Sequence, residues 1–204
     1  MTGFSSMAPY HVLIVDDAVE NISDFGPSTR DLLNGLGCIT ILVTSVKEAI
    51  AVLKTAYFDV LVIDINLGYG KETDGFLLQQ SIRELGQVQP IIMATGQPDE
   101  LKRPIKDYVD VFASGATFFY EKRKGKFVDL FSEAVRHIDP IRRALYLMKN
   151  NGYSDQPLVF GAESYTIEDL LVNNGKNEDV LRQLRDAFYE LFLEMWKNGD
   201  SVAI

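Results

Sequence analysis

The sequence has little cysteine and a deficit of basic charge, and it has no long apolar run. Cys38 is the single cysteine in 204 residues, which excludes an intramolecular disulfide framework and predicts a reducing compartment. The formal net charge of -9 argues against a general attraction to nucleic acid or to an anionic membrane. No apolar run approaches the length of a membrane span, and residues 1–9 lack the basic and apolar regions of a signal peptide. These absences predict a cytoplasmic protein.

Five short apolar segments alternate with helix-length segments along the first two thirds of the chain. The predicted strands are residues 11–15, 39–43, 60–64, 90–94 and 117–120. The predicted helices are residues 26–36, 45–53, 74–85, 99–113 and a segment from 126 onward. This alternation predicts a doubly wound parallel sheet with helices on both faces.

The apolar spacing assigns an inner face to each helix. The first helix is expected to start at Gly26-Pro27 and to stop at Gly37. Its expected inward residues are Leu32, Leu33 and Leu36. Ser45 and Glu48 form a capping box for the second helix. In the helix from residue 74 the expected inward residues are Phe76, Leu77, Ile82 and Leu85.

Polar side chains stand where four of the predicted strands end. Asp16 and Asp17 follow the first strand, Asp64 ends the third, Thr95 follows the fourth and Lys122 follows the fifth. The carboxyl ends of parallel strands share one edge, so these side chains could converge. Clustered carboxylates repel one another unless a cation neutralises them, and Mg²⁺ favours oxygen ligands. The set matches a phosphoryl-transfer site in which one carboxylate attacks phosphorus while the metal and the lysine neutralise charge.

Each of these residues also has a purely structural interpretation. Asp16 and Asp17 could cap the following loop or helix. Thr95 before Gly96 is an ordinary turn pair, and Lys122 stands beside two further basic residues. The joint pattern favours chemistry, because all the polar groups fall at one sheet edge.

Residues 10–137 resemble the receiver domain of bacterial two-component response regulators. The motifs that carry the resemblance are LIVDD at residues 13–17, LVID at 61–64, ATG at 94–96, and GA at 115–116 followed by Phe119 and Lys122. The resemblance implies a flavodoxin-like α/β fold with a five-stranded parallel sheet of order 2-1-3-4-5. We therefore expect a receiver domain over residues 10–138 and a mainly helical extension over residues 139–204.

The resemblance also implies a role for each site residue. Asp64 is the expected phospho-acceptor, served by a phosphohistidine of a sensor histidine kinase or a phosphotransfer protein. Mg²⁺ is expected to bind Asp64, Asp17 directly, Asp16 mainly through water, and the backbone carbonyl of Asn66.

Three further residues complete the implied machinery. Thr95 and Lys122 are expected to hold the phosphoryl group. Phe119 is the expected aromatic switch residue that turns inward as Thr95 moves, and plain core packing is an equally good interpretation of it.

The sequence departs from the family pattern around the site. Gly68 stands near the place of the family's usual proline, and Gly75 lies eleven residues after Asp64, about three residues later than the usual glycine. Arg123 replaces the proline that commonly follows the lysine. The segments 18–27 and 97–104 are also longer than usual, so the donor and partner specificity are expected to differ.

Beyond residue 138 the pattern predicts short elements and one long helix. A helix over residues 141–149 is followed by a stop at Asn150-Asn-Gly152, a short strand over 158–160 and a helix capped by Thr166. Asn177 is expected to cap the long helix. The apolar stripe of that helix is Leu181, Leu184, Phe188, Leu191, Phe192, Met195 and Trp196. The stripe either packs on its own chain or forms a homodimer or partner contact.

Three functions remain as hypotheses. The first is a phosphorylation-dependent switch that acts on a downstream protein partner and has no metabolic activity beyond its own phosphorylation and dephosphorylation. The second is a scaffold that works without phosphorylation. The third is a transcription regulator with an unrecognised DNA-binding tail. Residues 140–204 hold seven Lys and Arg against ten Asp and Glu, and no helix has a basic face, which argues against the third.

Overall fold

The structure, a computed structural model, describes residues 9–67, 74–84, 89–96, 118–122, 126–153, 157–160, 163–171 and 177–197. Within these ranges the side chains of Asp74, Phe160, Glu178 and residues 191–197 are not described. The predicted helix over residues 99–113, the loop over 68–73, and the Gly115-Ala116, Arg123 and Lys124 positions lie outside the described residues.

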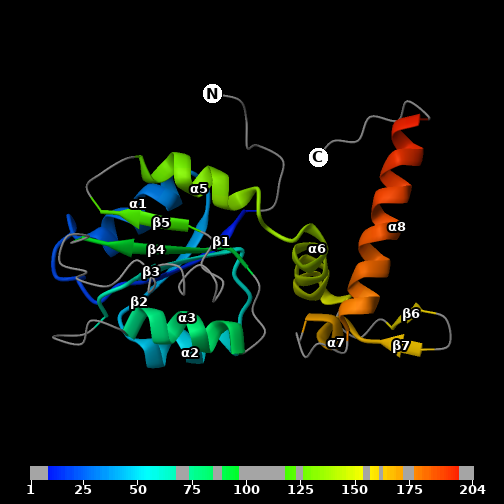
Figure 1. The fold of residues 1–204 in the computed structure, drawn as a ribbon, viewed down its shortest axis with the longest axis horizontal. Coiled ribbons are helices and arrows are strands. Elements are labelled where there is room, and N and C mark those ends of the chain that lie inside the picture. Colours follow the sequence, from blue (N-terminus) through cyan, green and yellow to red (C-terminus); the bar gives the residue numbers. More distant parts are fainter. Residues whose placement is uncertain are drawn as a thin grey trace, which may run out of the picture. The chain divides into compact units, whose positions relative to one another are not determined.

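A parallel sheet of five strands forms the centre of the first part of the chain (Figure 1). Its strands are β1 (His11–Val15), β2 (Ile39–Val43), β3 (Val60–Asp64), β4 (Ile91–Thr95) and β5 (Phe118–Glu121). Their order is β2-β1-β3-β4-β5, and each neighbouring pair is parallel. β3 and β4 are buried along their whole length, as continuous apolar runs in a parallel sheet should be. The predicted fold class and strand order are confirmed.

Helices cover both faces of the sheet. Figure 1 shows α1 (Phe25–Gly35) and α5 (Phe127–Val135) on one face, and α2 (Val46–Leu53) and α3 (Asp74–Glu84) on the other. Successive strand residues face opposite sides, so β1 contributes Leu13 and Val15 to the core under α2 and α3. Val12 and Ile14 pack on the opposite side with α1 and α5. The two apolar layers hold the sheet between the helices and fix its carboxyl edge.

The buried face of α1 differs from the prediction. α1 begins at Phe25 rather than at Gly26-Pro27, and it ends at Gly35 before Gly37, which adopts φ +86°. Leu33 is fully buried, but Leu32 and Leu36 are 41% and 45% exposed. The inner face runs through small residues, Gly26 and Thr29, at helical spacing with Leu33. The prediction that Leu32 and Leu36 point inward is therefore wrong.

The face of α3 is also rotated relative to the prediction. Leu77 is 55% exposed, whereas Leu78 and Ile82 are fully buried. Gly75 sets this rotation, because its N–H donates to the Ile65 carbonyl and its backbone lies directly against β3. Residues 75, 78 and 82 then share one helical face, and Leu77 is turned outward.

The capping prediction for α2 holds with one difference. Ser45 accepts a hydrogen bond from the Glu48 N–H at 3.2 Å, as a capping box requires. The Glu48 carboxylate accepts from the backbone N–H of Thr44 rather than from that of Ser45. The Ser45 hydroxyl thus satisfies a terminal N–H of the helix, and the Glu48 side chain satisfies an N–H of the segment before it.

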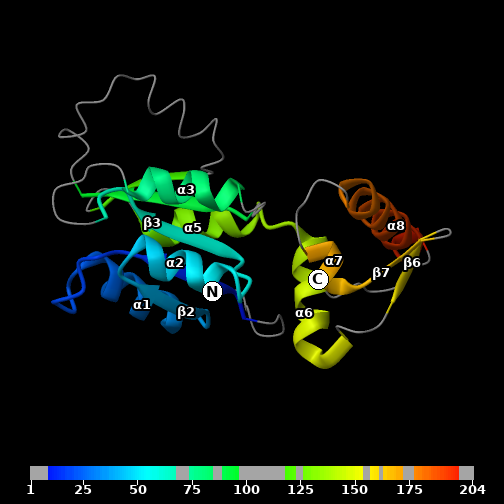
Figure 2. The same ribbon diagram turned by 90° about the horizontal axis from the view of Figure 1, so that it is seen from below.

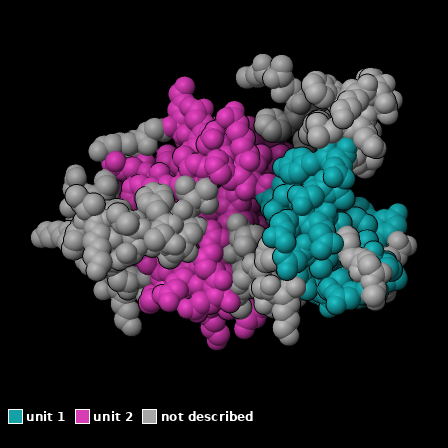
Figure 3. Space-filling view, turned by 45° about the vertical axis from the view of Figure 1, so that its right-hand side comes forward, with its two compact units in different colours: residues 1–8, 139–204 teal, residues 9–138 magenta. Residues whose placement is uncertain are grey.

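The contacts of the chain divide it into two compact units, with residues 9–138 in one and the chain from Asp139 onward in the other (Figure 3). The second unit contains α6 (Pro140–Met148), η1 (Lys149–Tyr153), β6 (Leu158–Phe160), β7 (Glu163–Tyr165), α7 (Ile167–Leu171) and α8 (Glu178–Lys197). β6 and β7 pair as an antiparallel hairpin (Figure 2). The sequence pattern predicts no strand over residues 163–165, so β7 is an addition.

The second unit has an apolar core of its own. Its buried residues are Ile141, Leu145, Ile167, Leu170, Val180 and Leu181. Leu184 packs against this core, whereas Phe188 is 49% exposed. The first turns of α8 therefore pack on their own unit. Across the described part of the chain, no helix combines the length and apolar character needed to cross a membrane.

Candidate functional site

The carboxyl edge of the sheet brings together groups that are far apart in the sequence. Lys122, just after β5, places its Nζ 2.7 Å from Oδ2 of Asp64 and 2.9 Å from Oδ2 of Asp16. The backbone N–H of Lys122 donates to the Thr95 carbonyl at 2.7 Å. The strand register pairs Asp64 with Ala94 and Thr95 with the residue before Lys122. The ends of β1, β3, β4 and β5 therefore meet at one place, as parallel strands require.

Three carboxylates form the acidic part of this edge. Each of Asp16, Asp17 and Asp64 offers an oxygen, and these oxygens all lie within 4.8 Å of one another. Asp16 is fully buried and Asp64 is 6% exposed. Two buried acids and a half-buried one beside the Lys122 ammonium keep excess negative charge, which a divalent cation with a preference for oxygen would neutralise. The donor set therefore fits Mg²⁺.

Local backbone groups fix the orientation of the two buried carboxylates. Oδ1 of Asp16 accepts the Ala18 N–H at 2.9 Å, and Oδ1 of Asp64 accepts the Asn66 N–H at 3.2 Å. Each acid thus gives one oxygen to the backbone and the other to Lys122. The orientation of the two carboxylates is thus set by nearby backbone N–H groups and by the lysine at the end of β5.

The surroundings of Asp64 raise the pKa of its carboxyl group above the usual value. The largest cause is burial, because loss of water disfavours the charged form. The Lys122 charge and hydrogen bond oppose this rise, and repulsion from Asp16 adds to it.

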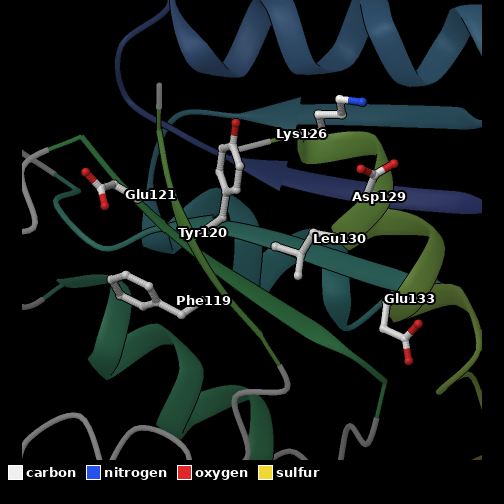
Figure 4. Close-up of a pocket in the computed structure, with 7 residues that line it drawn as sticks. All are labelled: Phe119, Tyr120, Glu121, Lys126, Asp129, Leu130 and Glu133. Atoms are coloured by element: carbon white, nitrogen blue, oxygen red, sulfur yellow. The ribbon is translucent and has the colours of Figure 1, made fainter. Parts of the chain in front are cut away.

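Thr95, Phe119 and Asn66 also lie at or near this edge. Thr95 is fully buried, and Asn66 follows Asp64 by two residues. Phe119 is half-buried and packs against the core under α2 and α3. Figure 4 shows Phe119 and its neighbour Tyr120 pointing to opposite sides of β5. The metal role of the Asn66 carbonyl and the switch role of Phe119 stay predictions.

A shallow depression lies beside β5 and α5, with a volume of about 410 Å³ (Figure 4). Its lining consists of Phe119, Tyr120, Glu121, Lys126, Asp129, Leu130 and Glu133. Phe119 therefore contacts the core and this surface at once, which is compatible with both interpretations of the residue.

Comparison with known proteins agrees with this geometry. The family of response regulator receiver domains matches residues 12–124. The chain belongs to this family. No curated protein sequence matches the chain.

Solved receiver structures share the fold at low sequence identity. The HemR receiver domain of Leptospira biflexa has 20% identity and a TM-score of 0.53, covering 65% of this chain and 98% of its own. The chemotaxis response regulator CheY4 of Vibrio cholerae has 22% identity and a TM-score of 0.52, covering 62% and 99%. A CheY-like receiver domain protein of Methanospirillum hungatei has 22% identity and a TM-score of 0.50, covering 71% and 100%.

Three residues shape the site through contacts that the sequence patterns do not predict. Gly75 allows the start of α3 to lie against the backbone of Asp64, and Gly26 allows the start of α1 to lie against Asp16. Phe25 places its ring beneath the Lys122 ammonium. A signal existed for the glycines, since each is a small residue in the first turn of a predicted helix. Nothing in the apolar pattern distinguishes Phe25 from an ordinary core residue.

Proposed function

We propose that this protein is a phosphorylation-dependent signalling switch that receives a phosphoryl group on Asp64. The donor is a phosphohistidine of a sensor histidine kinase or of a phosphotransfer protein. The observation that carries the proposal is the pair of contacts from Lys122 Nζ to Asp64 and Asp16, at 2.7 Å and 2.9 Å. It joins a nucleophile, a cation and a metal-binding acid at one sheet edge.

The chemistry assigned to Asp64 is nucleophilic attack on phosphorus. A carboxylate oxygen forms the new P–O bond, the P–N bond to the donor imidazole breaks, and its electron pair leaves with that ring. The product is an acyl phosphate, which water later hydrolyses to return the free carboxylate. Lys122 follows the charge from the carboxylate to the phosphoryl oxygens, and the Thr95 hydroxyl donates to one of them.

Asp16, Asp17, Asp64 and the backbone carbonyl of Asn66 are the proposed ligands of Mg²⁺. The spacing of the carboxylate oxygens, all within 4.8 Å, supports this set. When bound, the ion supplies charge neutralisation for the phosphoryl oxygens. By its likeness to the receiver family, Asp17 is the proposed direct ligand and Asp16 contributes mainly through a bridging water.

The proposed activity is regulatory, and it extends only to self-phosphorylation and dephosphorylation. Thr95 and Phe119 are the proposed switch residues, and the depression that Phe119 lines is a surface on which their movement would be read. The unit from Asp139 onward is the proposed output or dimerisation domain, with residues 10–138 as the receiver domain. A homodimer through α8 is one form of this output.

Charge pairing within the second unit argues against a DNA-binding output. Arg182 pairs with Asp179 at 2.7 Å and Arg185 with Asp139 at 3.0 Å. Lys149 pairs with Glu168. Binding to DNA requires cations that can neutralise phosphates, and a carboxylate next to each of these three cations lowers the local positive charge.

Incubation with acetyl phosphate and Mg²⁺, followed by mass spectrometry of the intact chain, tests the proposal. We expect a mass gain of one phosphoryl group in the wild type and none in Asp64→Ala. Asp31→Ala, a change of an exposed acid on α1, is the matched control and should be phosphorylated normally. No mass gain in the wild type, or a gain that survives Asp64→Ala, would favour the phosphorylation-independent scaffold.

A further inference from the structure

The Lys122 ammonium has a third contact besides its two carboxylates. Its Nζ lies over the ring of Phe25, 4.6 Å from the ring centroid. A cation at this distance from an aromatic face is attracted by the negative face of the ring. The Lys122 side chain is only 14% exposed, so water screens this attraction weakly.

The ring of Phe25 is fixed from two sides. Tyr120 of β5 stacks on it with centroids 5.8 Å apart and planes 27° apart. Phe127 at the start of α5 meets it edge-on at 5.9 Å and 82°. Phe25 is the first residue of α1, so three separate elements determine where its face points.

Gly26 explains how the start of α1 reaches this position. A Cβ at Gly26 would lie 3.0 Å from the Cβ of Asp16 and 3.1 Å from Leu42 Cδ1. Because glycine leaves this space free, the first turn of α1 packs directly against Asp16. The neighbouring Phe25 is thereby brought to Lys122, the partner of that same acid.

We propose that Phe25 is a positioning residue for Lys122, and that it holds the ammonium in place while the acids around it change charge. The inference rests on the proposed function. Phosphoryl transfer converts an Asp64 oxygen into an acyl phosphate oxygen. Mg²⁺ would compete with Lys122 for the oxygens of the same acids. Both carboxylate contacts of Lys122 therefore weaken. The ring contact uses no lone pair of the acids and is unaffected by their charge. It therefore gives the lysine one constant contact while its anionic partners change from the carboxylates to the phosphoryl oxygens.

Three variants separate positioning from core packing. Phe25→Leu keeps an apolar side chain and removes the ring, whereas Phe25→Tyr keeps the ring face. Phe131→Leu makes the same change in a buried ring that stacks on Phe127 in the same core. It serves as the matched control for lost packing.

The measurements are the rate of phosphorylation by acetyl phosphate at saturating Mg²⁺, the Mg²⁺ affinity, and the NMR shifts of the Lys122 side chain. In the reaction the P–O bond to Asp64 forms while the bond from phosphorus to the acetyl oxygen breaks, and acetate leaves with the electron pair. We expect Phe25→Leu to slow phosphorylation by roughly twofold to thirtyfold, the range that a cation–π contact supports. Phe25→Tyr should restore the rate.

The Mg²⁺ affinity should stay within about twofold of wild type in all three variants, because no metal ligand is altered. The Lys122 methylene resonances should show an upfield ring-current shift in the wild type and in Phe25→Tyr, and lose it in Phe25→Leu. A Phe25→Leu rate equal to that of Phe131→Leu, a parallel loss of Mg²⁺ affinity, or a failure of Phe25→Tyr to restore the rate would overturn the inference.

Failure of the inference and failure of the proposed function give different results. If the wild type gains no phosphoryl group on Asp64, both are overturned. If the wild type is phosphorylated and the variants match their control, only the role of Phe25 is overturned. If the wild-type Lys122 resonances show no ring-current shift, the contact between Phe25 and Lys122 is absent and the inference is overturned. This test does not depend on whether Phe25→Leu folds.

Discussion

Replacing Gly75 with alanine tests how tightly α3 is packed against the strand that ends in Asp64. The added Cβ would lie 2.2 Å from the Asp64 carbonyl oxygen and 2.8 Å from both Cα and the carbonyl oxygen of Ile65. Ordinary contact begins at 3.4 Å, so the helix has to move by about 1.2 Å. The obstacles are backbone atoms and cannot rotate away. Overpacking of this kind costs about 1–3 kcal/mol, and the strained Gly75–Ile65 hydrogen bond adds about 1 kcal/mol.

We therefore expect Gly75→Ala to lower the free energy of unfolding by roughly 3 kcal/mol in equilibrium urea denaturation. The matched control is Gly35→Ala at the end of α1, where an added Cβ meets no atom within 4 Å. That change should stabilise the protein by up to about 1 kcal/mol, because alanine favours the helix and restricts the unfolded chain. Gly75→Ala should also weaken Mg²⁺ binding, since the displaced backbone carries Asp64. Equal stabilities of the two variants would refute the close approach of α3.

Three further predictions follow from burial and charge. Leu78→Ala should lower the free energy of unfolding by about 2–5 kcal/mol, because Leu78 is fully buried. Leu77→Ala on the exposed face should change it by less than about 0.5 kcal/mol. Similar values for the two variants in chemical denaturation would contradict the assigned helix face. Burial, and to a smaller extent the charge of Asp59, raises the pKa of the Cys38 thiol from 9.0 to about 11. The unfolded chain therefore loses this proton at lower pH than the folded chain does. The free energy of unfolding should consequently fall as the pH rises from 9 to 11. Cys38→Ala should lack this component, and identical pH profiles would count against it. Mg²⁺ at a hundred times its dissociation constant should stabilise the protein by about 2.7 kcal/mol, measured as a rise in the unfolding temperature. Asp17→Asn should largely abolish this rise. If the rise persists in Asp17→Asn, the ion binds elsewhere.

The strands were predictable from the sequence, whereas the helix faces were only partly so. β3 and β4 are continuous apolar runs, and a central parallel strand is the structure in which such a run is buried on both sides. In α1 and α3 several leucines compete for the inner face, and the outcome depends on glycines that touch the strands. Periodicity counts apolar residues and gives no weight to Gly26 or Gly75. It therefore selects the exposed Leu32, Leu36 and Leu77 together with the buried Leu33 and Ile82.

The convergence of the site was predictable because it follows from topology. Once β1, β3, β4 and β5 are parallel, the residues after them share an edge, and Asp16, Asp64 and Lys122 meet there. The third partner of the lysine was not predictable. Phe25 reaches it from a helix start, across a loop whose length gives no indication of where the ring will lie.

The acidic edge of the sheet carries more negative charge than the Lys122 ammonium neutralises. The two buried carboxylates, Asp16 and Asp64, share the Lys122 ammonium, the half-buried Asp17 lies beside them, and burial raises the pKa of Asp64. Such a group costs stability, which the apolar layers on both faces of the sheet offset. The imbalance is what makes the edge responsive. A divalent cation would relieve the repulsion among the acids, and the proposed phosphorylation of Asp64 would move negative charge from its carboxylate to the phosphoryl oxygens. Each event changes what Lys122 can contact, so the same ammonium that stabilises the resting edge can report on its chemical state.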